Sequence, residues 1–159
     1  MAEATTPRWH YETAYDNVEE GAWYRDSNNE NADLAWGESY VMMSLAAMYR
    51  STQDPLYLDR LAWHIDGVLQ QRDDARQVSD YRGESGACWQ CTSYSTEPYC
   101  WAVHSGMIGF PIADFAALVR ETELEDHHAN DGERFGDKAE RYIEAALETV
   151  DFHEEQWND

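Results

Sequence analysis

Three residues with acid–base side chains stand near the starts of two segments that we expect to form buried helices. Glu38 and Tyr40 lie early in the first segment, and His104 holds the comparable place in the second. A carboxylate, a phenol and an imidazole that converge on one rim are groups suited to general acid–base catalysis. A buried Glu38 would also need a partner or a purpose, since an unpaired carboxylate is costly to remove from water. We therefore name Glu38, Tyr40 and His104 as candidate catalytic residues.

Three tryptophans lie close to these residues in the sequence. Trp36, Trp89 and Trp101 offer flat aromatic faces of the kind that bind sugar rings. The ordinary alternative is a set of core aromatics with satisfied polar tips, beside a histidine bonded to a backbone carbonyl. Both interpretations stay open at this point.

Three cysteines fall in one short segment. Cys88, Cys91 and Cys100 form a C-x2-C-x8-C-x3-H pattern with His104. Three thiolates and one imidazole can complete a tetrahedral zinc site. The alternatives are a redox CxxC pair, which lacks its usual strand–helix context, and buried cysteines that act as small apolar residues. An odd count without a visible signal peptide argues against a disulfide framework.

The positions of apolar residues predict an all-α fold with four main helices. We expect them over residues 32–52, 55–72, 101–121 and 132–151. The first and third are apolar nearly all round, as buried helices are, whereas the second and fourth carry one apolar stripe. Residues 1–31 are rich in aromatics without a period, and we expect an irregular arm packed on the helices. Residues 73–100 form a long loop, and such loops are often functional.

An internal repeat relates the two halves of the chain. The stretch AAMYRST at 46–52 matches AALVRET at 116–122, and a buried helix is followed by an amphipathic one in both halves. This pattern predicts two stacked helical hairpins with inner and outer layers, in a domain over residues 32–159. The first repeat covers about 32–72 and the second about 101–157. A closed four-helix bundle is the alternative, which the unequal helix faces disfavour.

The chain is strongly acidic, with 32 acidic residues against 11 basic ones and a formal net charge of −21. Only one of the basic residues is a lysine, Lys138. Molar salt screens such self-repulsion, so we expect a protein adapted to a high-salt cell. No basic stripe is present for phosphates, and we expect no nucleic-acid partner. No signal peptide or apolar run of transmembrane length is visible, so we expect a cytoplasmic protein without a membrane partner, although a processed or trimmed chain fits equally well.

Several short motifs resemble the α/α-toroid carbohydrate enzymes. These motifs are AWGESY at 35–40, LAAMYRSTQDPLYLD at 45–59, DYRG at 80–83, VHSGMI at 103–108 and FHEEQW at 152–157. They are similar to segments of the six-hairpin glycosidase-like superfamily, which includes uronate lyases and glucuronyl epimerases. A full toroid has six hairpins, whereas the repeat predicts two in this sequence. The chain departs from the family here, as a fragment of a longer protein, a minimal relative or a subunit that completes a ring by association would.

The resemblance also implies a substrate cavity walled by the loops that enter the inner helices. Carried over to this sequence, it points to Trp36, Glu38, Tyr40, Asp80, Arg82, Trp89 and His104. Arg82 would pair with a substrate carboxylate. We therefore expect a carbohydrate-active or carbohydrate-binding domain for an acidic polysaccharide, with lyase, epimerase and hydrolase chemistry all open. The alternative is a non-catalytic helical-repeat scaffold that forms a homo-oligomer or binds a protein.

Overall fold

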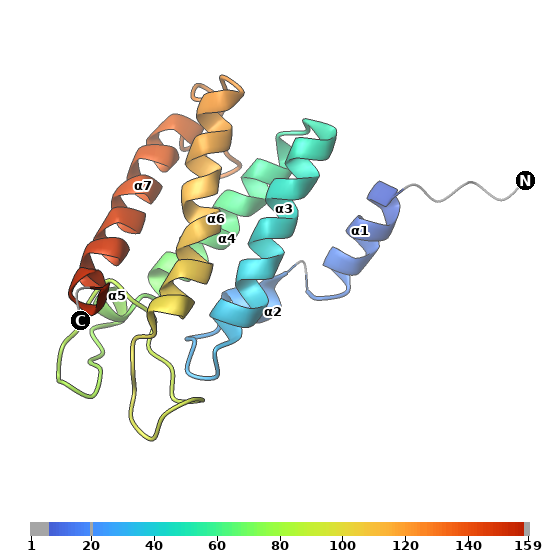
Figure 1. The fold of residues 1–159 in the computed structure, drawn as a ribbon. Coiled ribbons are helices and arrows are strands. Elements are labelled where there is room, and N and C mark those ends of the chain that lie inside the picture. Colours follow the sequence, from blue (N-terminus) through green and yellow to red (C-terminus); the bar gives the residue numbers. More distant parts are fainter. Residues whose placement is uncertain (1–6, 20, 158–159) are drawn as a thin grey trace, which may run out of the picture.

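The protein is all-α in the computed structural model, which describes residues 7–19 and 21–157 (Figure 1). Seven α-helices account for most of the regular structure. Within those ranges the only β-type pairing is two isolated antiparallel bridges, Cys91 with Tyr99 and His128 with Arg134. The all-α class predicted from the apolar spacing is therefore confirmed.

The four predicted helices are present with small shifts at their ends. The elements in chain order are α1 (Pro7–Asp16), α2 (Ala22–Arg25), a π-helical turn (Leu34–Glu38), α3 (Ser39–Thr52), α4 (Leu56–Gln70), α5 (Asp73–Arg76), α6 (Ala102–Glu121), α7 (Phe135–Phe152) and a 3-10 turn (Glu154–Trp157). The expectation of an irregular N-terminal arm was wrong for residues 7–16 and 22–25. Helix α1 was missed because its aromatics show little helical periodicity.

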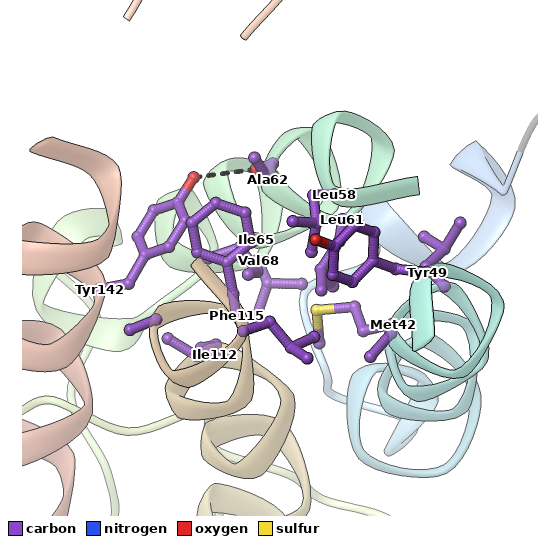
Figure 2. Packing of buried hydrophobic residues seen from close by; sticks show 14 of the residues in the cluster. Met42, Tyr49, Leu58, Leu61, Ala62, Ile65, Val68, Ile112, Phe115 and Tyr142 are labelled. Carbon is purple, nitrogen blue, oxygen red and sulfur yellow. Dashed lines mark hydrogen bonds between the residues drawn. The ribbon is translucent and has the colours of Figure 1, made fainter. Parts of the chain in front are cut away.

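The core lies between α3, α4, α6 and α7. Helix α6 packs most extensively on α7, and α3 packs on both α4 and α6. Figure 2 shows the contact region, in which the Tyr142 hydroxyl donates to the carbonyl of Ala62. The buried side chains shown there include Met42, Tyr49, Leu58, Leu61, Ile65, Val68, Ile112 and Phe115. These residues come mainly from the apolar faces that the sequence predicted.

The long segment between α4 and α6 is anchored to the core by one tryptophan. Trp89 is fully buried, and its indole N–H donates to the carbonyl of Val68 at 2.9 Å. The buried Asn29 side chain ties this loop to the start of the α3 region, because its amide donates to Trp89 O and its oxygen accepts from Ala35 N. These hydrogen bonds fix the position of the loop relative to α4 and to the start of the α3 region.

Helix α6 is the one helix, among those described, that is long and apolar enough to cross a bilayer. This revises the expectation that no segment reaches that length and composition. Half of its most apolar stretch is buried inside the protein, and core helices of water-soluble proteins pass the same test. The result is weak evidence for a membrane span.

Candidate functional site

Six rings from three parts of the chain form one continuous group, which we call the aromatic cluster. Its members are Trp36, Tyr81, Tyr94, Tyr99, Trp101 and His104. Trp36 comes from the π-helical turn, the three tyrosines from the long loop, and the last two from the start of α6. The long loop therefore brings three tyrosines to the first turn of α6.

His104 lies at the centre of the aromatic cluster. Its ring centroid is 5.5 Å from that of Trp36 and 5.7 Å from that of Tyr94, with edge-to-face geometry in both pairs. The imidazole is 1% exposed, and burial lowers the pKa of His104 below its usual value. Burial therefore favours the neutral imidazole, which can accept a hydrogen bond at one ring nitrogen and donate one from the other.

Two nitrogens in the aromatic cluster are buried without a hydrogen-bond partner among the described residues. They are Nδ1 of His104 and the indole Nε1 of Trp101. Leaving such groups unsatisfied costs about 1–3 kcal/mol each. Water or a ligand hydroxyl would satisfy them, so the cluster combines unused polar groups with aromatic faces.

Several faces of the aromatic cluster are open to solvent. The exposed fractions are 40% for Trp36, 55% for Tyr81 and 59% for Tyr94. Tyr81 stacks on Tyr99 at 5.6 Å, and Tyr99 contacts Trp101 at 4.7 Å. The cluster therefore offers exposed aromatic faces beside buried polar groups.

Glu38 belongs to a different group of residues from His104. It is fully buried, and its Oε1 pairs with Nδ1 of His64 on α4. The other ring nitrogen of His64 bonds to the hydroxyl of Tyr15 on α1 at 2.9 Å. Burial raises the pKa of Glu38, and the hydrogen bond from His64 opposes that rise. The structure thus assembles a buried Tyr15–His64–Glu38 chain.

Helical geometry explains why the predicted catalytic residues separate. Trp36 and Tyr40 are four residues apart and share one helix face, whereas Glu38 lies two residues from each and faces inward. Tyr40 is 53% exposed and Glu38 is 0% exposed. Trp36 therefore contacts His104, whereas Glu38 forms its hydrogen bond with His64.

The other residues proposed for substrate binding have local partners. The Asp80 carboxylate is buried and accepts from the backbone N–H of Arg82 at 2.8 Å and from its Nε at 2.8 Å. Arg82 also pairs with Glu84 at 3.1 Å. Trp89 offers no face to a ligand because it is fully buried. Asp80 and Arg82 form a turn in the loop, and Trp89 is a core residue.

The predicted four-ligand zinc site is not formed by the cysteines and His104. Cys88 and Cys100 are joined in a disulfide, which also corrects the sequence argument against disulfide bonding. Cys91 is buried and free, and its sulfur accepts from the backbone N–H of Ser93. His104 faces the aromatic rings instead. The spacing failed as a guide because a twelve-residue separation suits a disulfide as well as a shared metal.

A buried aspartate lies beside this disulfide. Asp73 is fully buried, and its two carboxylate oxygens accept from the backbone N–H of Gln90 at 3.2 Å. Burial raises the pKa of Asp73 to about 7. Its Oδ2 is 3.6 Å from the sulfur of Cys88 and 3.4 Å from that of Cys100.

Sequence reasoning missed the tyrosines of the aromatic cluster and the histidine that pairs with Glu38. Tyr81, Tyr94 and Tyr99 carry no local signal, because loop residues show no period. His64 did carry one, since it falls beside Leu61 and Val68 on the apolar stripe of α4. A histidine on an apolar stripe indicates a buried partner, and here that partner is Glu38.

The comparisons with known proteins return no relative for this chain. No protein-family model, curated protein or solved structure matches it. The function must therefore be argued from the site itself.

Proposed function

We propose that this chain is a carbohydrate-binding domain of the α/α-toroid type, with the aromatic cluster as its sugar site. In this proposal α3 with α4 and α6 with α7 are two hairpins, of which α3 and α6 form the inner layer. A sugar ring stacks on Trp36 and Tyr94, and its hydroxyls reach the nitrogens of His104 and Trp101.

One observation carries the proposal: exposed aromatic faces surround two buried nitrogens that have no partner among the described residues. Sugar rings present apolar C–H faces to aromatic rings and hydroxyls to polar groups. Figure 1 places the start of α6 and the long loop at the same end of the molecule as the start of α3, where a ligand would have access to both.

If the domain is an enzyme, His104 is its acid–base residue. A neutral imidazole can take the C5 proton of a uronic acid, as lyase or epimerase chemistry on an acidic polysaccharide requires. The large negative charge of the protein opposes an acidic polymer at low ionic strength, and molar salt removes most of that long-range repulsion. Glu38 acts on this site only through the fold, because its contacts are with His64.

The proposal is tested by calorimetric titration with neutral and uronic oligosaccharides in molar KCl. We expect one sugar class to bind and Trp36→Ala to weaken binding about tenfold, which corresponds to ~1.4 kcal/mol. Trp63→Ala is the matched control, because Trp63 is 42% exposed, close to the 40% of Trp36, and lies outside the aromatic cluster. Equal weakening by both variants, or no binding by the wild type, would count against the proposal.

A second candidate function is a self-associating helical scaffold. An apolar groove of about 390 Å³ lies between α6 and α7 and includes Gly106, Phe110 and Val150. Phe110 is 59% exposed and Val150 is 62% exposed. Exposed apolar side chains that line a groove are a common feature of interfaces between helical units.

Sedimentation analysis separates the second candidate from the first. A scaffold should form a concentration-dependent oligomer that Phe110→Ser disrupts, while Trp36→Ala leaves it intact. A protein that stays monomeric at high concentration, with its sugar affinity unchanged by Phe110→Ser, would leave only the carbohydrate proposal.

A further inference from the structure

The strongest unexplained group outside the aromatic cluster is the buried set of Asp73, Cys88 and Cys100. One ligand-type atom from each residue lies within 4.8 Å of the others, and all three residues are at most 1% exposed. The described residues include no ion pair to Asp73. Among the residues that the structure describes, its only close hydrogen-bond donor in the oxidised form is the backbone N–H of Gln90.

The disulfide leaves Asp73 poorly satisfied. A thiol hydrogen on Cys88 or Cys100 would point to Oδ2 over 3.6 or 3.4 Å. Sulfurs joined in a disulfide carry no hydrogen, so these contacts become lone pairs facing a buried carboxyl group. Burial of such a group without compensation is costly. The surroundings therefore favour a state in which Asp73 holds its proton, the sulfurs carry protons, or the sulfurs share a cation with Asp73.

We propose that reduction of the Cys88–Cys100 disulfide opens a metal site in which both thiolates and the Asp73 carboxylate bind Zn²⁺. Zinc binds sulfur at about 2.3 Å and carboxylate oxygen at about 2.0–2.2 Å, so the ligand atoms of a tetrahedral site lie about 3.6–3.8 Å apart. The oxygen–sulfur separations of 3.6 and 3.4 Å already approach this spacing. Only the two sulfurs have to move apart, once their bond is broken.

The chemistry balances with a dithiol as reductant. The dithiol gives two electrons and two protons to the disulfide, which becomes two thiols, and the dithiol becomes a disulfide. Zn²⁺ then displaces the thiol protons, which pass to solvent. Three protein ligands leave one position for water or for a nearby oxygen. The side-chain oxygen of the buried Gln90 has no partner within the described residues, and Gln90 adjoins the site through the bond from its backbone N–H to Asp73.

Anchoring around the site keeps its parts in place during reduction. The backbone N–H of Asp73 donates to Cys88 O at 2.8 Å, and the neighbouring Trp89 is fixed to Val68. On the other side, Cys91 and Tyr99 exchange two backbone hydrogen bonds just before Cys100. The loop is thus held by contacts that do not depend on the disulfide.

The test compares oxidised and reduced samples of the full chain, with disulfide content checked by mass and the fold by circular dichroism. Zn²⁺ binding is measured by calorimetry, and Co²⁺ is added as a spectroscopic probe of thiolate ligation. We expect one Zn²⁺ per chain and a thiolate–cobalt band in the reduced sample only. Asp73→Asn keeps an acceptor for Gln90 N–H and should weaken Zn²⁺ binding at least about tenfold.

Cys91→Ser is the matched control, because Cys91 is equally buried but is not part of the set. It should leave Zn²⁺ affinity unchanged. The proposal is overturned if the oxidised protein binds Zn²⁺ as tightly as the reduced one, if Cys91→Ser abolishes binding, or if the reduced, folded protein binds no Zn²⁺. Sugar binding is measured in the same samples, so that failure here is distinguished from failure of the carbohydrate proposal.

Discussion

At the scale of single residues, burial changes the pKa of an acidic side chain, as Glu38 shows. Glu38 is removed from water by the packing of α1, α3 and α4, and its Oε2 has no partner among the described residues. Desolvation therefore outweighs the hydrogen bond from His64 and raises the pKa of the Glu38 carboxyl. The folded state holds this proton more tightly than the unfolded chain does.

The raised pKa of Glu38 predicts a pH-dependent loss of stability. A carboxyl whose folded pKa exceeds its unfolded value costs nothing when protonated in both states, and destabilises the fold as pH rises through the folded pKa. Each unit of elevation corresponds to about 1.4 kcal/mol. We expect Glu38→Gln to become progressively more stable than the wild type between acid and neutral pH, as measured by urea unfolding in molar KCl.

An exposed substitution controls for the general effect of removing one negative charge. Glu140→Gln lies on the exposed face of α7. This variant should change the free energy of unfolding by a small amount at every pH. It should not show the growing difference from the wild type that is expected for Glu38→Gln. A difference between Glu38→Gln and wild type that stays constant with pH would contradict the explanation.

Residue types alone could not assign the candidate site. Trp36 and Trp89 are identical in type, yet one is 40% exposed and the other is fully buried. Glu38 and His104 looked like partners because both follow the start of a buried helix. The helical turn between Trp36 and Glu38 decides that Trp36, and not Glu38, faces His104. The path of the long loop decides which rings surround His104, and that path could not be predicted from the sequence.

At the scale of elements, the four main helices could be predicted because their apolar spacing is regular. Helices α3, α4, α6 and α7 each carry enough buried positions to fix a period. Helices α2 and α5 have four residues each, too few to show one. The contacts between elements were harder to foresee, since ion pairs between α4 and α7 join residues more than seventy positions apart.

Lys138 is the clearest example of such a contact. Its side chain is 1% exposed, and its Nζ lies 2.7 Å from Asp66 on α4, 2.7 Å from Asp131 and 3.2 Å from Glu133. The one lysine of the chain therefore contacts three carboxylates at the junction of α4 and α7, and Arg141 is a second cation for Asp66 and Glu133 at 3.0 and 2.8 Å.

Removing this cation should loosen the junction. Lys138→Met keeps much of the side-chain volume but removes the cation beside Asp131 and leaves Asp66 and Glu133 with Arg141 alone, and we expect a loss of about 2 kcal/mol. Arg120→Met makes the same change in net charge at an exposed position of α6 and should cost much less. Denaturant titration measures both, and equal losses would show that Lys138 acts only through net charge.

At the scale of the whole molecule, charge is the dominant feature. A net charge of −21 on 159 residues makes carboxylates repel one another over the whole surface. The Debye length falls from about 10 Å at 0.1 M salt to about 3 Å at 1 M. We expect the unfolding midpoint to rise as KCl increases over this range.

A variant with fewer surface charges separates screening from other salt effects. Glu123, Glu140 and Glu144 are acidic residues on the second half of the chain, and the last two are exposed on α7. Replacing all three by glutamine should lessen the slope of stability against KCl concentration. An unchanged slope would mean that KCl acts by a route other than screening of carboxylate repulsion.

The central claim is that the aromatic cluster binds sugar, and NMR of the tryptophan indole groups tests it most directly. The chain has seven tryptophans, whose indole N–H signals can be assigned by single substitutions. On titration with the oligosaccharide that binds in molar KCl, we predict that the signals of Trp36 and Trp101 shift together, while those of Trp63 and Trp89 stay in place. Shifts confined to Trp63, or no shift at any sugar concentration, would contradict the proposal.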